Sequence, residues 1–338
     1  DPFTNALWRG SALNASDFAD EAKAMACCQA LSSYQFDRIA NEFSEDDELR
    51  AFTGSVPRPA AIFAPYFYIE PSNATEWLDL VLRLAAVTAS AERRLPVHAI
   101  LCVDESFLLE PSFIARLKAE IPPTGVKGVW FWFSRLTEDR APLESLKALR
   151  SLVEDLSETV QVFNMHGGYL SLAMCKFGMA GTSHGVGYGE QKDVLPIIGQ
   201  STPTVRYYLP PVHKRFGVPD IQRCFLALDV RTPQDFHEQV CDCVICKGVV
   251  SENLAQFAAF GDMHRSRAES KRLAQTPAAA KRCRFHFLLC RIRERNRLKD
   301  ATVTDIVQDL ESAKAKWRPQ PSMRTELEFL DRWISALG

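Results

Sequence analysis

The run Cys-Asp-Cys-Val-Ile-Cys, which contains Cys241, Cys243 and Cys246, constrains the fold more than any other part of the sequence. Its C-x-C-x-x-C spacing brings three soft sulfur ligands close enough to bind one tetrahedral Zn²⁺. The alternative is three reduced, partly buried cysteines, because free cysteine often packs as a small apolar residue. The clustering favours a metal site. A fourth ligand must then come from the downstream segment, where His286 and His264 are the candidates.

Length and composition indicate an ordinary globular protein. With 338 residues and 46% hydrophobic residues, the chain can bury the core of one large α/β domain or two smaller ones. The ten cysteines suggest no disulfide framework, which fits a reducing compartment, so we expect a cytoplasmic protein. No apolar stretch approaches the ~18 residues of a transmembrane helix, so no membrane partner is expected.

Strand-like and helix-like patterns alternate from residue 60 onward. Six apolar runs read as strands: 60–69, 98–104, 126–133, 160–164, 179–187 and 204–209. Helical patterns between them indicate a parallel sheet, and a series this long predicts an α/β fold of the (β/α)8-type TIM barrel, regular or irregular. We expect three parts: a helical N-terminal segment (1–58), the barrel core (59–221) and a zinc-binding helical appendage (222–338).

Polar residues fall at or after the ends of these strands, where barrels carry their chemistry. They are Glu70, Asp104, Ser134, Arg135, Asn164, His166, His184, Glu190 and Arg206. The G-x-G-x-x-G and P-loop motifs are absent, so dinucleotide and triphosphate chemistry are unsupported. The H-x-E and P-C-x-x-C pattern of zinc deaminases is also absent.

The net charge of −2 favours no partner, but its distribution is uneven. Residues 265–299 hold twelve Lys and Arg against Glu269 and Glu294. Such a segment is either a footprint for a polyanion or a solvated helix face. A long helix predicted over residues 278–298 would also place Cys283, His286 and Cys290 near one another.

Four segments, in this order, resemble the tRNA-guanine transglycosylase superfamily over about residues 60–295. Val103-Asp104-Glu105-Ser106 resembles a strand end whose Asp contacts the target base. Asn164-Met165-His166-Gly167-Gly168 resembles a base-binding segment, and residues 181–190 resemble a Gly-rich strand that ends in Gly-Glu. The cysteine motif with a His in Arg284-Phe285-His286-Phe287-Leu288-Leu289 is similar to the zinc site of that superfamily.

The resemblance implies a zinc-containing barrel that cleaves a nucleobase–ribose bond. The zinc ligands would be the three cysteines of the motif and His286, with His264 as the fallback. A closed Cys₃His set leaves no position for water, which makes the zinc structural. Base or substrate contacts would come from Asn164, His166, Gly167, Gly168, His184, Gly187 and Arg206.

One departure from the superfamily changes the expected reaction. No carboxylate stands in residues 205–215, where the nucleophilic Asp belongs, and the early Asp-Ser-Gly-Gly is absent near residue 65. Base exchange needs a sugar-linked intermediate, whereas hydrolysis needs a stabilised sugar cation and a positioned water. We therefore expect Asp104 to be the catalytic carboxylate, with Glu70 and Glu190 as second choices.

The sequence thus predicts a DNA glycosylase-like enzyme that flips out a modified base and leaves an abasic site. DNA is favoured over tRNA because the carboxylates of the tRNA enzymes are missing and relatives act on modified DNA bases, including in anti-phage defence. Two alternatives stay open: a transglycosylase that inserts a deazaguanine into DNA or tRNA, and a non-catalytic nucleic-acid-binding subunit. Contacts to the nucleic-acid backbone are expected from Lys214, Arg215, Arg291 and Arg295.

Overall fold

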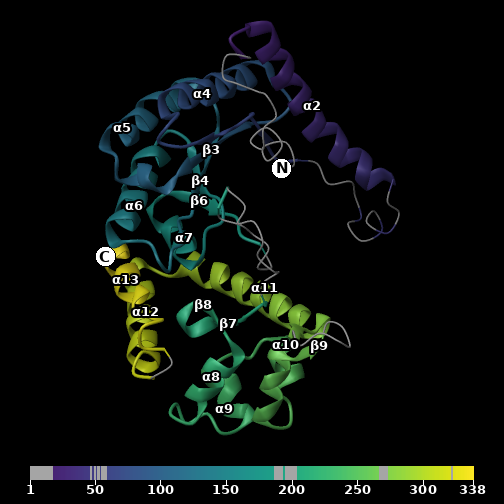
Figure 1. Ribbon diagram of the computed structural model, residues 1–338, viewed down its shortest axis with the longest axis vertical. Coiled ribbons are helices and arrows are strands. Elements are labelled where there is room, and N and C mark those ends of the chain that lie inside the picture. The colour runs from purple at the N-terminus through teal and green to yellow at the C-terminus, as the bar shows by residue number, and fades with distance from the viewer. Residues whose placement is uncertain are drawn as a thin grey trace.

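The computed structural model describes residues 18–45, 48, 51, 54, 59–185, 193–194, 204–265, 273–320 and 323–338. These residues form two lobes, one above the other in Figure 1. The first lobe contains a parallel sheet with helices packed on it, and the second is mostly helical. The chain is therefore an α/β protein. Every described helix is too short or too polar to cross a membrane.

The sheet of the first lobe has six parallel strands. They are β1 (Ile62–Phe63), β2 (Tyr68–Ile69), β3 (Val97–Asp104), β4 (Gly128–Ser134), β5 (Gln161–Asn164) and β6 (Met179–Thr182). Their spatial order is β1-β3-β4-β5-β6, and β2 also pairs with β3. Ile62 pairs with Val97 at the start of β3, and Ile69 pairs with Val103 near its end. The short strands β1 and β2 therefore follow one another along the same side of β3.

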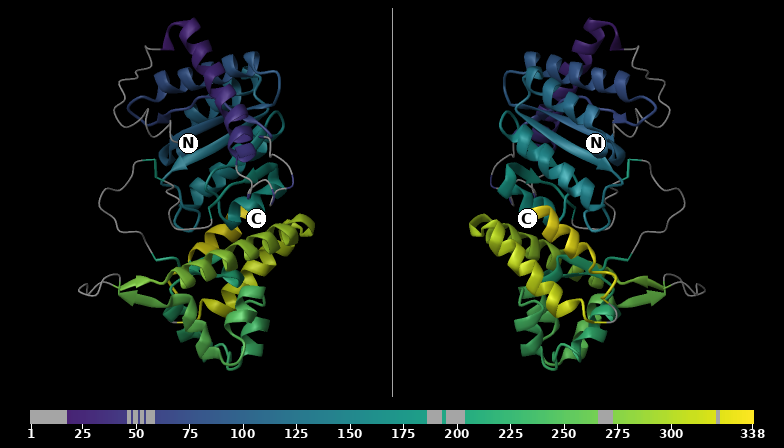
Figure 2. Two further views of the ribbon diagram at one scale, coloured as in Figure 1. Left: turned by 90° about the vertical axis from the view of Figure 1, so that its right-hand side faces the viewer. Right: turned by 90° about the vertical axis from the view of Figure 1, so that its left-hand side faces the viewer.

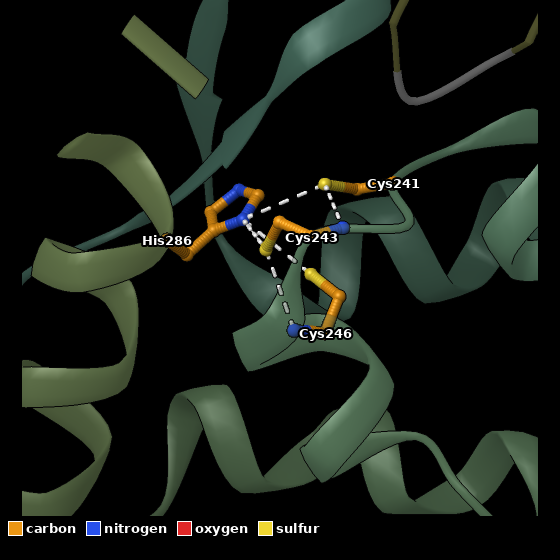
Figure 3. A group of neighbouring side chains, drawn as sticks. All are labelled: Cys241, Cys243, Cys246 and His286. Carbon is orange, nitrogen blue, oxygen red and sulfur yellow. Dashed lines mark hydrogen bonds between the residues drawn. The ribbon is translucent and has the colours of Figure 1, made fainter. Parts of the chain in front are cut away.

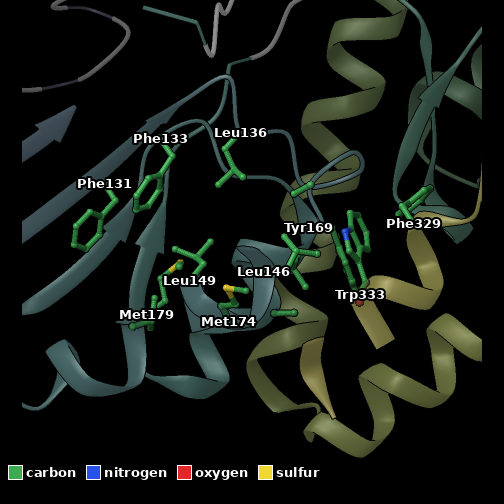
Figure 4. Close-up of a cluster of buried hydrophobic side chains, with 14 of the residues drawn as sticks. Phe131, Phe133, Leu136, Leu146, Leu149, Tyr169, Met174, Met179, Phe329 and Trp333 are labelled. Atoms are coloured by element: carbon green, nitrogen blue, oxygen red, sulfur yellow. The ribbon is translucent and has the colours of Figure 1, made fainter. Parts of the chain in front are cut away.

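Helices connect the strands and fill the main core on one face of the sheet. They are α4 (Ala74–Ala91), α5 (Pro111–Glu120), α6 (Leu143–Ser157) and α7 (Tyr169–Ala173). Side chains alternate along a strand, so Phe131 and Phe133 of β4 enter this core, where Leu146 and Leu149 of α6 also lie (Figure 4). The apolar spacing of α6 thus matches the face that it buries.

The opposite face of the sheet is aromatic and only partly covered. Trp130 and Trp132, which alternate with the two core phenylalanines, are half-buried there beside Tyr68 and Phe63. We call these four residues the aromatic face. Helix α2 (Glu21–Glu45) lies at its edge, where the Gln35 amide bonds both the carbonyl and the N–H of Phe63 at 2.8 and 2.9 Å. This side chain protects the free edge of β1.

The second lobe is built around one long helix, α11 (Pro277–Asp300). The other elements are β7 (Tyr207–Leu209), β8 (Lys214–Phe216), α8 (Val218–Phe225), α9 (Pro233–Gln239), α10 (Val244–Val249), β9 (Met263–Arg265), β10 (Leu273–Gln275), α12 (Val303–Trp317) and α13 (Phe329–Leu337). Figure 1 shows α11 between the lobes, and α13 returns to the first lobe. There Arg150 of α6 donates to the carbonyls of Ala336 and Leu337, both at 3.1 Å.

One prediction about the sheet is wrong, and another is confirmed only in part. Residues 204–209 were expected to form a sixth strand of the parallel sheet, but β7 pairs antiparallel with β8 in a separate hairpin. An apolar run identifies a strand without identifying its partner, so the sequence could not show this. Among the described residues, moreover, the strands do not complete an eight-stranded barrel. The predicted domain boundary between residues 221 and 222 falls inside α8.

The α13 contact gives a test of how the lobes are joined. Trp333 is 2% exposed, packs edge-on against Phe329 and donates from its indole to the carbonyl of Glu138 at 2.8 Å. Trp333→Ala should lower the free energy of unfolding by about 3–5 kcal/mol, since it leaves a cavity and an unpaired carbonyl. Urea unfolding measures this. Leu226→Ala, at a position that is 77% exposed, should change it little; equal effects would contradict the packing role.

Candidate functional site

Three cysteines converge at the start of a short helix in the second lobe. Cys241 follows α9, Cys243 is the N-cap of α10, and Cys246 lies in the first turn of α10. The backbone N–H groups of Cys243 and Cys246 point at the sulfurs of Cys241 and Cys243, with N···S distances of 3.5 and 3.4 Å. The turn thus gathers the sulfurs and places amide donors against them, which favours thiolates.

The fourth donor comes from α11. The Nδ1 atom of His286 lies 3.8, 3.4 and 3.4 Å from the sulfurs of Cys241, Cys243 and Cys246 (Figure 3). In a tetrahedral site with metal–sulfur bonds of about 2.3 Å and a metal–nitrogen bond of about 2.1 Å, the S···N edge is about 3.6 Å. All four donor atoms lie within 4.8 Å of one another and all four residues are buried. The geometry therefore suits one structural metal ion.

The prediction that His286 joins the three cysteines is confirmed, because its ring nitrogen lies among their sulfurs. His264 lies on β9, where it pairs with Ala274, and its side chain is exposed outside the group. Because four protein donors surround the centre, a tetrahedral ion there would have no open position for a water or a substrate.

Outer contacts fix the donors in place. The Nε2 atom of His286 is 2.6 Å from the carbonyl oxygen of Tyr208, so it carries the proton and leaves Nδ1 free for the ion. The hydroxyl of Tyr207 lies 3.2 Å from the sulfur of Cys246. Hydrogen bonds from neighbouring thiols, that of Cys243 first, hold the pKa of Cys241 far below its ordinary value. The hydrogen bonds at Cys241 therefore stabilise negative charge on its sulfur.

A buried ionic cluster continues from the metal centre along α11. Glu294 accepts hydrogen bonds from the hydroxyl of Tyr208 at 2.6 Å and from Arg291 at 2.7 Å, and it contacts Nδ1 of His213 at 2.6 Å. Burial lowers the pKa of His213. Burial alone would raise the pKa of Glu294, but Arg291 and His213 outweigh it and lower that pKa. The ring of His213 stacks on Tyr169 of the first lobe, with centroids 3.4 Å apart.

The structure contradicts one predicted contact to the nucleic-acid backbone and weakens the case for another. Arg291 was expected on a nucleic-acid-binding surface, but it is 8% exposed and paired with Glu294. Lys214 is held by Asp139 and Glu326, at 3.2 and 3.0 Å. Arg291 is therefore not a nucleic-acid contact. The positive charge of Lys214 is largely neutralised by its two carboxylate partners.

A second constellation lies at the carboxyl end of the parallel strands. Oδ1 of Asp104 accepts from the backbone N–H and the hydroxyl of Ser106, at 3.0 and 2.7 Å. Its Oδ2 accepts from the hydroxyl of Tyr68 at 3.1 Å and from Arg135. Burial raises the pKa of Asp104, but the bonds from Ser106 and Arg135 more than offset this and lower it. Asp104 is therefore a well-held, ionised carboxylate that also caps the 3-10 helix Glu105–Leu109.

Other predicted residues near this edge have internal partners. Asn164 donates to the hydroxyl of Ser171 at 2.7 Å. A Cβ on Gly167 would lie 2.1 Å from Oγ1 of Thr182, and one on Gly168 would lie 2.6 Å from Oε2 of Glu138. These glycines are thus required by close packing in the first lobe, whatever they bind.

The remaining predicted residues are dispersed. Glu70, at the end of β2, accepts from the hydroxyl of Ser72 at 3.0 Å. The ring of His166 lies 5.0 Å from that of Trp132, and His184 contacts Phe287 edge-on. Five further predicted residues complete the set: Arg215 lies over the ring of Phe287, Arg206 and Arg295 are exposed, and Glu190 and Gly187 lie outside the described residues.

Three residues of this edge were not in the predicted site. Tyr68 and Arg135 both bond Asp104, and Trp132 stands beside His166. Arg135 directly follows β4 and Asp104 is the last residue of β3, so the position of Arg135 at a strand end was a usable signal. Tyr68 was not recognisable, because its contact with Asp104 joins residues 36 apart in sequence.

Comparison of the chain with models of known protein families, with curated proteins and with solved structures finds no match. The site must therefore be interpreted from its own geometry.

The metal centre makes a direct prediction. The purified protein should contain about one metal ion per chain. The Cys243→Ser variant should lose most of this metal and should no longer unfold cooperatively, because a structural ion contributes folding energy. Metal analysis and thermal unfolding measure both. Cys283→Ser is the matched control, since Cys283 is equally buried on α11 but its sulfur contacts the carbonyl of Phe260. A metal-free wild type, or full metal in Cys243→Ser, would contradict the site.

The Asp104 network predicts a dependence of stability on pH. The pKa of Asp104 is lower in the folded protein than its ordinary value, so its contribution is present at neutral pH and is lost as pH falls through that folded pKa. The difference in unfolding free energy between the wild type and Asp104→Asn should therefore shrink as the solution becomes acidic. Urea unfolding at several pH values measures it, with exposed Glu252→Gln as the control. A constant difference would contradict the ionised state.

Proposed function

We propose that this chain hydrolyses the N-glycosidic bond of a modified nucleobase in DNA and leaves an abasic site. The proposal rests chiefly on the Asp104 carboxylate, which is ionised and fixed at the carboxyl edge of a parallel sheet, beside the aromatic face. Ligands of open parallel sheets bind outside that edge. The order of the four segments that resemble the transglycosylase superfamily supports the same chemistry.

The hydrogen bonds of Asp104 decide which role suits it. Each carboxylate oxygen already accepts from two donors, and its pKa is lowered, so Asp104 is a poor base. It also lacks a free oxygen for attack on a sugar. Its fixed negative charge is suited to stabilise an oxocarbenium-like sugar while water attacks. This favours hydrolysis over base exchange.

Aromatic and cationic neighbours could hold an extruded base. Trp132 offers a half-buried indole on which a base can stack, and stacking is worth about 1–3 kcal/mol per base. The Arg135 side chain is 59% exposed while Asp104 anchors its guanidinium. Its other N–H groups make no hydrogen bond to a described residue, so they can meet a base edge or a phosphate. His166, beside Trp132, can donate to the departing base.

The outer face of α11 supplies the cations for the backbone. Lys281, Arg284, Arg295 and Lys299 are exposed, and none of them makes an ion pair with another described residue. Lys and Arg that neutralise phosphates release counterions and bind DNA without sequence preference. Of the predicted backbone contacts, Arg295 belongs to this set.

We further propose that the ion of the Cys₃His centre is Zn²⁺ with a structural role, because sulfur and imidazole donors in tetrahedral geometry are its usual ligands. The complete (β/α)8 barrel remains a prediction, supported by the parallel strands and their helical connections.

A non-catalytic nucleic-acid-binding subunit is the second candidate. The observation in its favour is again Asp104, because a carboxylate that holds Tyr68, Ser106 and Arg135 and caps a helix has a sufficient structural role. Base exchange has no comparable support.

One experiment distinguishes the two candidate functions. Single-stranded and duplex DNA carrying 7-deazaguanines or substituted pyrimidines is incubated with the protein and then treated with alkali. Hydrolysis predicts strand breaks at one class of base, with a rate that falls about 100-fold or more in Asp104→Asn. Exposed Glu252→Gln should keep the rate. Binding of DNA without breaks by the wild type would support the subunit, and incorporation of labelled free base would support exchange.

A further inference from the structure

The outer face of α11 carries large apolar side chains as well as cations. Phe285, Leu288 and Ile292 are 53%, 41% and 46% exposed. At about 100° per residue, they fall within about 60° of one another around the helix axis. Cys283, on the opposite side of the helix, is buried. We call the three exposed residues the apolar stripe. Single exposed apolar residues are ordinary, whereas a contiguous group of them marks an interaction surface.

The cations of α11 lie on the same sector as the apolar stripe. Lys281 and Lys299 fall in line with it at its two ends, and Arg284 and Arg295 fall along one side of it. The only carboxylate between Pro277 and Lys299 is Glu294, which is buried. The outer face of α11 is therefore apolar and positively charged at once.

We infer that this face binds single-stranded DNA. A duplex turns its phosphates outward and keeps its bases stacked inside, so it can satisfy the cations but leaves the apolar stripe against sugars and phosphates. A single strand offers phosphates to the cations and unpaired base faces to the apolar side chains. Proteins that bind single strands combine these two kinds of group, with an aromatic ring such as Phe285 as the stacking platform. The inference rests on the proposed function in one respect, that DNA is the ligand.

Protein partners fit the same face less well. A second copy of this chain would bring two cationic faces together, and like charges across an interface are costly. A helix of another protein would need acidic residues all along its rim. A nucleic acid meets that requirement by its own chemistry, because every nucleotide carries a negative charge.

The direction of α11 places a bound strand usefully. The helix runs from the β9–β10 hairpin to the first lobe, where Lys176 donates to the carbonyl of Lys299 at 3.0 Å (Figure 1). From Lys281 to Lys299 the helix rises about 27 Å. A strand that follows α11 is thus directed toward the lobe that holds Asp104. Its bases have no partner to lose, so they reach that lobe without the cost of extrusion from a duplex.

Binding of unmodified DNA tests the inference on the full chain. The probes are a labelled thymine oligonucleotide of about 12 nucleotides and a duplex of the same length, compared by fluorescence anisotropy at one salt concentration. The wild type should bind the single strand about 10-fold or more tightly than the duplex. Phe285→Ala should weaken single-strand binding about 5- to 150-fold, the loss of one stacked base, and change duplex binding less than about twofold.

The control is Leu226→Ala, an exposed apolar position outside α11 that should leave both affinities unchanged. Thermal unfolding confirms that each variant is folded, which is expected because both side chains are exposed.

Salt dependence separates the apolar stripe from the cations. Arg295→Gln removes one phosphate contact, so it should weaken both forms of DNA and reduce the slope of log affinity against log salt by about 0.7 for the single strand. Phe285→Ala should leave that slope unchanged, because it removes no charge.

Equal affinity of the wild type for the two probes, or single-strand binding that Phe285→Ala does not change, would overturn the inference. Self-association of the protein that Phe285→Ala abolishes, without DNA binding, would overturn it too and assign the face to a protein contact. Because the probes are unmodified, binding is measured apart from cleavage. Strand breaks in modified duplex DNA without a preference for single strands would reject this inference alone. Single-strand preference without strand breaks at any modified base would reject the proposed hydrolysis alone.

Discussion

The imidazole of His286 is the contact on which the second lobe depends. One of its nitrogens faces three cysteine sulfurs, and the other bonds the carbonyl of Tyr208. A single side chain thus ties α10, β7 and α11 together. Neither short element would be stable alone, since α10 has six residues and β7 has three. An ion bound by the four donors would supply cohesion that their small apolar area cannot.

The predictions that succeeded depended on local patterns. The C-x-C-x-x-C turn brings its sulfurs together by its own geometry, whereas His286 was preferred over His264 through the resemblance to a superfamily whose zinc site includes a histidine on a helix. The strands β3 to β6 followed from short apolar runs between helical patterns. For the cysteine turn and the strands, the signal and the structure lie within a few residues of one another.

The failures share a different cause, which is contact between distant segments. Arg291 and Arg295 look alike in a basic run, yet one turn of helix places Arg291 against Glu294 and the core, and leaves Arg295 in solvent. The strand at Tyr207–Leu209 was recognisable, but its pairing with β8 was not. Tyr68 and Arg135 changed the expected chemistry of Asp104 by occupying its oxygens, and the Tyr68 contact has no sequence signature.

The metal centre and the sheet edge are also physically connected. From His286 the contacts run to Tyr208, whose hydroxyl bonds Glu294, and then to His213, which stacks on Tyr169. Tyr169 begins α7, and the Glu138 carboxylate caps this start through the N–H groups of Gly168 and Leu170, at 2.6 and 2.9 Å. Every step is a buried or partly buried contact, so the centre is linked to the Gly168 backbone through packing and hydrogen bonds. A structural ion can therefore matter for a reaction at the sheet edge without touching the substrate.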